Sequence, residues 1–157
     1  MEARVKLLGH PVHQMLIVLP LGLLTGALIF DVLHLLTGGA HFALVSYWLI
    51  PAGIAGGLLA AVFGFLDWTK IPADTRAKKV GVGHARANVT VLVIFAVSWW
   101  LRRDNPVEPG TIPTVLVLLG GGLAMVSGWL GGELVNRHGV GVDDDADLNA
   151  PSSLSGR

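Results

Sequence analysis

No cysteine occurs among the 157 residues of this chain. That absence excludes disulfide bonds, thiolate zinc sites, iron–sulfur clusters held by thiolates and covalent haem attachment through a CxxCH motif. Any redox cofactor would therefore be held by histidine, carboxylate or methionine side chains.

Charged residues are also scarce. They make up 14% of the chain against 52% hydrophobic residues, whereas soluble domains carry about 25% charged residues. The 21 glycines in so apolar a chain favour close helix contacts in lipid over flexible linkers. These proportions predict a membrane protein.

Four apolar stretches are long enough for helices that cross about 30 Å of hydrocarbon. They lie at about residues 12–36, 42–66, 80–101 and 112–134. We therefore expect an all-α, integral membrane four-helix bundle over residues 1–141. Residues 142–157 are acidic, rich in serine and poor in apolar residues, which predicts a disordered tail.

The basic residues indicate the orientation. An even number of spans places both termini on one side, and nine of the 11 lysines and arginines belong to that side. Only Arg102 and Arg103 belong to the other side. By the positive-inside rule both termini should be cytoplasmic, with the chain a multi-pass protein of a bacterial inner membrane. The basic residues are thus a topology signal, and nothing indicates nucleic-acid binding.

Small residues recur every four positions in the fourth span, at Gly120, Ala124, Gly128 and Gly132. Such a face lets helix backbones approach closely. It fits a tight four-helix bundle, and it equally fits a homodimer. No inverted repeat of the transporter kind is evident.

Histidines gather at the predicted cytoplasmic end. His13 opens the first span and His84 the third, and two histidines on facing helices are the usual ligands of haem b in a bundle. We expect these two to bind a cofactor, either haem b or a transition metal. The metal ligands expected in this layer are His10, His13, His84 and Glu133, with Asp67, Asn88 and His138 as hydrogen-bonding supports.

Plainer interpretations stand beside this one. Histidines are common at membrane interfaces, and Glu133 and Arg137 are spaced to pair along one helix. At the opposite end, Asp31 and His34 lie one turn apart and are expected to pair with each other through a hydrogen bond. Only the first span supplies a histidine there, which disfavours two stacked haems.

Three separated motifs resemble one family. HPVHQMLIVLPLGLL begins at His10, HARAN covers residues 84–88, and WLGGELVNRHGVGV covers residues 129–142. Together they resemble the bacterial membrane family "domain of unknown function 2231" over about residues 8–142. The family's motif positions found in this chain are His10, His13, His84, Asn88, Gly131, Gly132 and Glu133.

Members of that family look like four-helix membrane proteins, and some are fused to Rieske iron–sulfur or cytochrome-type domains. The resemblance implies membrane electron transfer. A chain without cysteine cannot hold a Rieske cluster, so it would be the membrane partner of a separate redox protein.

Three hypotheses follow for the function. The first is an electron-transfer subunit that binds haem or a metal and exchanges electrons with a redox protein or quinone. The second is a non-catalytic scaffold subunit of a larger complex, and the third is a small proton or ion conductor that uses Glu133, Asp67 and the histidines. No nucleophile–base pair or phosphate loop is evident, so an independent enzyme is not expected.

Overall fold

In the computed structural model, residues 1–155 are described. A hairpin of two short strands, β1 (Lys6–Leu7) and β2 (His10–Pro11), comes first. The helices that follow are α1 (Val12–Leu16), α2 (Val18–Thr37), α3 (Ala40–Lys70), α4 (Arg76–Leu101) and α5 (Thr111–Asn136). The chain is thus mostly helical, and the small hairpin is the one addition to the expected all-α fold among the described residues.

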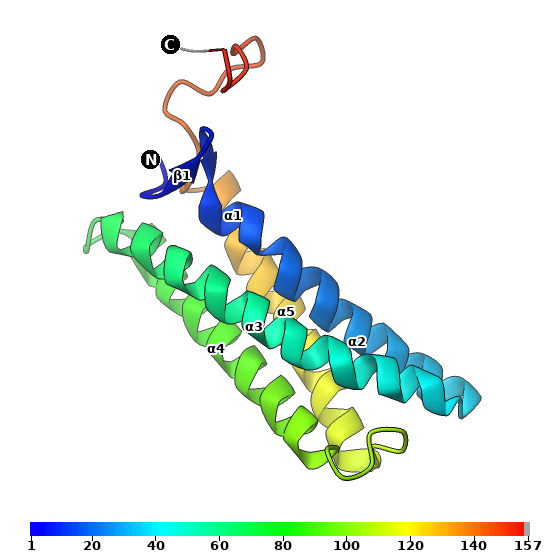
Figure 1. Ribbon diagram of the computed structural model, residues 1–157. Helices are drawn as coiled ribbons and strands as arrows, with labels where there is room; N and C mark the ends of the chain where they lie inside the picture. The colour runs from blue at the N-terminus through cyan, green and yellow to red at the C-terminus, as the bar shows by residue number, and fades with distance from the viewer. Residues whose placement is uncertain (156–157) are drawn as a thin grey trace.

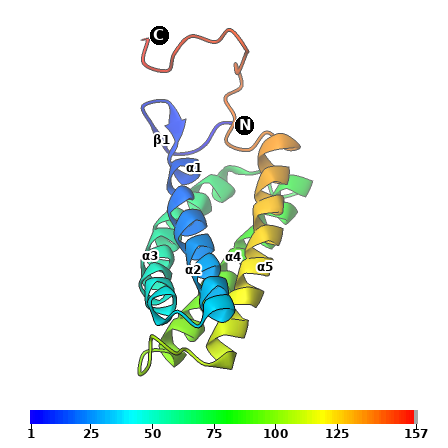
Figure 2. The ribbon, with the colours of Figure 1, turned by 90° about the vertical axis from the view of Figure 1, so that its right-hand side faces the viewer.

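Four of these helical segments are long and apolar enough to cross a membrane, as predicted, with α1 and α2 counting as one. The helices lie side by side in a bundle, with both chain termini at the same end (Figure 1). We call this the terminus end, and the opposite end, with the α2–α3 and α4–α5 connections, the far end. Figure 2 shows the strand hairpin and the tail beyond the helices at the terminus end.

The helices extend beyond the apolar stretches from which they were predicted. α3 continues to Lys70 and α4 already begins at Arg76, since helical hydrogen bonding does not stop at the hydrocarbon boundary. Thr75 caps α4 by accepting a hydrogen bond from the backbone N–H of Lys78. Gly38 ends α2 with a φ of 69°, the left-handed conformation that glycine adopts at least cost.

The first span is interrupted at Ile17, between α1 and α2. Pro20 has no N–H to donate to the carbonyl of Leu16, so one helical hydrogen bond is missing at this point. Helical hydrogen bonds from Ile17 to His13 and from Leu21 to Ile17 continue across this point, so α1 and α2 form one span. α1 packs against α3.

An apolar cluster forms the core between the two ends. Its buried members are Leu24, Ala27, Ile50, Val91, Phe95 and Val117. In the most apolar window of each span only 17% to 28% of the residues are buried. The remaining apolar side chains face outward, as they must where lipid surrounds the bundle.

The helices form two hairpins, because α2 packs mainly on α3 and α4 mainly on α5. The hairpins repeat one another in their internal contacts. An added Cβ at Gly53 would lie 2.5 Å from Leu24, and one at Gly120 would lie 2.8 Å from Phe95. Phe95 follows Leu24 by 71 residues (95 minus 24), and Gly120 follows Gly53 by 67 residues (120 minus 53).

Contacts between the hairpins follow the same symmetry. α3 packs on α4, and α2 packs on α5, so a two-fold axis along the bundle relates α2 to α4 and α3 to α5. Both hairpins begin at the terminus end, which makes the repeat parallel and not inverted.

Candidate functional site

His13 is held against α3 at the terminus end. Its Nδ1 lies 2.9 Å from the carbonyl oxygen of Ala60. A carbonyl oxygen only accepts, so Nδ1 carries a proton, and in the neutral ring Nε2 carries the lone pair. The ring lies on Gly64, where an added Cβ would be 2.8 Å from Cε1 of His13.

His84 repeats this arrangement in the second hairpin. Its Nδ1 lies 2.9 Å from the carbonyl oxygen of Ser127 in α5, and its ring lies on Gly131, where an added Cβ would be 3.2 Å from Cε1. His84 follows His13 by 71 residues (84 minus 13), and Ser127 follows Ala60 by 67 (127 minus 60). The two histidines therefore occupy equivalent positions about the two-fold axis.

Gly64 and Gly131 make room for the histidine rings for the same reason. A helical side chain covers the turn before its own Cα, so residue i+4 overlies the carbonyl of residue i. Gly64 and Gly131 leave the carbonyls of Ala60 and Ser127 open to an imidazole. We call these two positions, where an imidazole bonds a helix carbonyl beside a glycine, the histidine seats. They were not predicted, although the sequence contains a signal for them: a small residue four positions before a glycine.

Asn88 adds a polar contact to only one of the two histidines. Its Nδ2 donates to Nε2 of His84 over 3.1 Å and to the backbone carbonyl of His84 over 3.0 Å. Asn88 therefore contacts His84, and its role as a support for a cofactor ligand stays a prediction.

The other residues expected in this layer lie apart from the pair. His10 is exposed on β2, with Nε2 3.3 Å from Ser153 Oγ in the tail. Asp67 accepts a hydrogen bond from the backbone N–H of Arg4 over 2.6 Å. Glu133 lies 3.9 Å from Arg137 and, with His138, lines a groove between α4 and α5.

One group of three acidic or histidine side chains within residues 1–155 has ligand atoms within 4.8 Å of one another. It consists of Glu2, Asp143 and Asp145. The set His10, His13, His84 and Glu133 is not such a group.

A buried ion pair at the far end was missed by the sequence analysis. Arg102 donates from Nη1 to Oδ1 of Asp31 over 3.0 Å and from Nη2 to Oδ2 over 2.9 Å. Asp31 is fully buried and Arg102 is 1% exposed. The expected Asp31–His34 pairing was wrong, because His34 instead bonds the carbonyl of Gly39 through Nδ1.

Two serines complete this network. Ser46 of α3 accepts from Arg102 over 3.3 Å, and Ser98 of α4 accepts from it over 3.1 Å. Ser98 in turn donates to the carbonyl of Pro113 in α5 over 2.7 Å. All four spans are thereby tied together, and the partners offset the cost of burying a charge in lipid. Arg102 is an internal residue and not the surface charge assumed in the topology argument.

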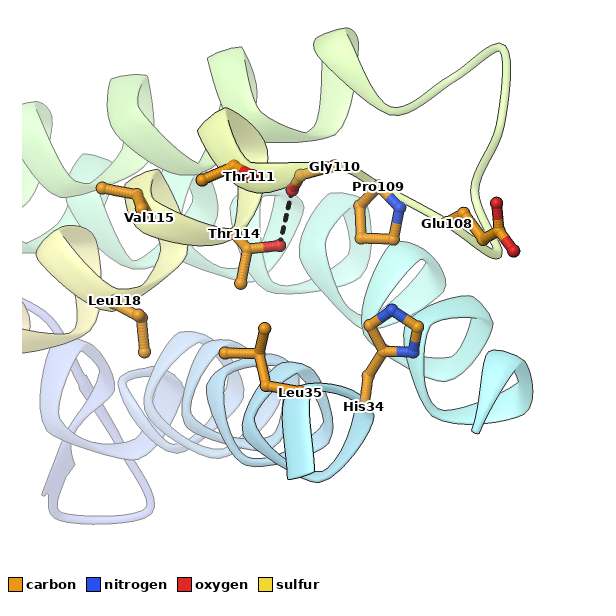
Figure 3. A pocket seen from close by; sticks show the side chains of 9 residues that line it. All are labelled: His34, Leu35, Glu108, Pro109, Gly110, Thr111, Thr114, Val115 and Leu118. Atoms are coloured by element: carbon orange, nitrogen blue, oxygen red, sulfur yellow. Dashed lines mark hydrogen bonds between the residues drawn. The ribbon is translucent and has the colours of Figure 1, made fainter. Parts of the chain in front are cut away.

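A pocket of about 450 Å³ lies beside this network, between the end of α2 and the start of α5. Figure 3 shows His34 and Leu35 on one side of it and Pro109 to Leu118 on the other. Thr114 lines the pocket and donates to the carbonyl of Gly110 over 2.9 Å. The lining is mainly apolar and offers few ligand atoms, so the pocket does not add a metal site.

The predicted tail contains no helix or strand within residues 142–155. It is nevertheless held at its start, since the N-terminal ammonium group lies 3.1 Å from Asp144 and Lys6 pairs with Asp143. The last two residues of the predicted tail, 156 and 157, lie outside the described residues.

The sequence matches the model of one family, described as "Predicted membrane protein (DUF2231)", over residues 9–144. That match covers both histidine seats and the buried ion pair. No curated protein and no solved structure matches the chain.

Proposed function

Since the chain belongs to the DUF2231 family of membrane proteins, we propose that it binds haem b or a transition metal ion through His13 and His84. In this proposal it serves as an electron-transfer subunit of a bacterial inner membrane, with both termini cytoplasmic. A separate redox protein or a quinone would exchange electrons with it.

One observation carries the proposal. Two imidazoles come from equivalent positions of the two hairpins, and each donates Nδ1–H to a backbone carbonyl. Metal-ligating histidines usually make this second hydrogen bond, which fixes the ring and leaves Nε2 to the metal. Two such ligands on facing helices suit a haem or metal centre in a bundle.

In this proposal one side chain must rotate before the centre can form. The Asn88 amide, which now donates to Nε2 of His84, must turn away, at the expense of about one hydrogen bond or about 1 kcal/mol. Bound iron or copper would supply a one-electron couple, while His13, His84 and the glycines beneath them hold its position.

The middle of the bundle gives the conductor hypothesis less support. The terminus-end histidines and the far-end ion pair are separated by the apolar cluster of Leu24, Ile50, Phe95 and Val117. Those side chains have no group that accepts or donates a proton. Glu133 lies at a surface groove and not on the axis.

The test uses the full chain, purified in detergent from haem-replete cells. Oxidised and dithionite-reduced absorption spectra and a metal analysis of the same sample measure the cofactor content. We expect about one haem or one metal ion per chain, since each half supplies one ligand. An empty wild-type protein would overturn the proposal and leave the scaffold hypothesis in its place.

The ligand variants are His13→Asn and His84→Asn. Asparagine places an N–H donor close to the position of Nδ1, so the hydrogen bond to the helix carbonyl is kept while Nε2 is lost. Each variant should insert and unfold like the wild type but lose the cofactor. His41→Asn, at an exposed position of α3 at the far end, is the matched control and should load normally.

A further inference from the structure

A second candidate site lies on the outside of the bundle, at the terminus end. It is a groove of about 380 Å³ lined by Arg76, Trp129, Glu133, Arg137 and His138. Arg76 is the first residue of α4. Trp129 and Glu133 lie near the end of α5, and Arg137 and His138 directly follow that helix. We call it the α4–α5 groove.

Positive charge dominates this groove. Arg76 and Arg137 face one carboxylate, that of Glu133, which lies 3.9 Å from Arg137 Nε. The Arg137 side chain is 75% exposed, so this ion pair is loose and screened by water. Arg76 has no ion pair within residues 1–155. The N-terminus of α4 adds the positive end of a helix dipole.

His138 supplies an unsatisfied polar atom. Its Nε2 is buried and has no hydrogen-bond partner in the described chain. Buried polar nitrogens are nearly always satisfied in folded proteins. Because that nitrogen is buried, a ligand in the α4–α5 groove can reach it only after the imidazole turns toward the groove.

The groove lies at the depth of lipid headgroups. Trp129 is 65% exposed on α5, and tryptophan side chains favour the boundary between headgroups and hydrocarbon. Further into the membrane, α5 presents apolar side chains that are strongly exposed, with Met125 at 76% and Val126 at 53%. An acyl chain can therefore lie along α5 below the groove.

We propose that the α4–α5 groove binds the phosphodiester headgroup of an anionic phospholipid. Arg76 and Arg137 hold the phosphate oxygens through charge-assisted hydrogen bonds, and Trp129 packs on the glycerol region. Basic pockets between helices at the cytoplasmic side bind such lipids, so this proposal rests on the cytoplasmic orientation proposed above. This proposal does not depend on a cofactor at His13 and His84.

Native mass spectrometry of the full chain tests it, with phosphatidylglycerol and phosphatidylcholine as the probes. Wild-type protein should retain phosphatidylglycerol through delipidation better than phosphatidylcholine. The double variant Arg76→Gln/Arg137→Gln should lose retention by about fivefold for each arginine removed. Glu133→Gln removes the one opposing charge and should raise retention several-fold.

The matched control is Lys79→Gln/Arg86→Gln. It removes two exposed charges from the same part of α4 but none from the groove. Its phosphatidylglycerol retention should stay within about twofold of wild type, since general charge attraction is weak and screened by salt. Equal losses in the two double variants would overturn the proposal, because they would mean general charge attraction alone.

Two other results would also overturn it. Equal retention of phosphatidylcholine would show that the headgroup charge is not recognised. Displacement of phosphatidylglycerol by millimolar inorganic phosphate would show a site for a soluble anion and not for a lipid. Because both arginines are exposed, the variants should fold, and circular dichroism of each sample checks this.

Discussion

At the residue scale, the positions of the two central histidines depend on glycines in the neighbouring helices. Gly64 and Gly131 each clear a helix carbonyl that receives an imidazole N–H. The predicted layer held four histidines, yet only His13 and His84 have such seats. What separates these two from His10 and His138 is the glycine across the helix interface, and not their distance from the membrane surface.

Gly64→Ala should therefore destabilise the protein. The new Cβ would lie 2.8 Å from Cε1 of His13, so the ring must shift and its bond to Ala60 must lengthen. Overpacking of this kind costs about 1–3 kcal/mol, measured as a lower thermal midpoint in detergent. Gly128→Ala is the control, because an added Cβ there meets nothing within 4 Å. Equal thermal midpoints for the two variants would contradict the packing of His13 on Gly64.

At the element scale, the N-terminal hairpin joins α3 to the tail. Arg4 bonds Asp67 of α3 through its backbone N–H, and Lys6 pairs with Glu2 and Asp143. The hydrogen bond to Asp143, with a smaller effect of Glu2, raises the pKa of Lys6 above its ordinary 10.5. A charged Lys6 thus helps to hold the start of the tail at the terminus end, together with the N-terminal ammonium group at Asp144.

This contact should be lost in alkali. Because the folded-state pKa of Lys6 is raised, its stabilising effect is complete below pH 10.5, the ordinary value, and disappears as the pH rises through the higher folded value. A spin label on a single cysteine introduced at Asn149 reports tail mobility, and the cysteine-free chain makes labelling specific. Mobility should increase above about pH 10.5.

Lys6→Met is the reference for that experiment. Its tail should be more mobile than the wild-type tail already at neutral pH. That mobility should not increase further over the pH range in which Lys6 titrates in the wild type. A wild-type tail that moves equally at pH 8 and at pH 11.5 would show that Lys6 does not hold it. The same label in the two proteins makes the comparison independent of the probe.

The sequence was sufficient to predict the four spans but not the side-chain contacts between them. Apolar runs of about 20 residues define the four helices, because lipid requires both length and low polarity. It was not sufficient for the Asp31–Arg102 pair, since the two residues are 71 positions apart and meet only when the hairpins pack. The helix carbonyls that accept from His13 and His84 are marked in the sequence only by a small residue four positions before a glycine.

At the scale of the whole molecule, the fold consists of two structurally equivalent helical hairpins. The repeat is hard to see in the sequence because the first helices are offset by 71 residues (84 minus 13) and the second by 67 (127 minus 60), and few equivalent residues are identical. Asp31 and Arg102 are themselves equivalent positions (102 minus 31 is 71). Their contact therefore lies on the two-fold axis, where equivalent residues meet.

Exchanging these two residues tests the symmetry. Asp31→Arg or Arg102→Asp alone leaves like charges buried together and should cost about 3–5 kcal/mol or prevent folding. In the double variant each residue occupies the equivalent place of the other, so most of the lost stability should return. Thermal unfolding in detergent measures this, and a double variant no better than the singles would contradict the two-fold relation.

The ion pair on the axis also requires the two halves of the fold to differ. A homodimer of the first hairpin would set one Asp31 against another, and a homodimer of the second would set Arg102 against Arg102. Two identical halves could not make this contact, so the two hairpins depend on carrying opposite charges at equivalent positions. Each half now carries the counter-charge of the other, and neither can be replaced by a second copy of its partner.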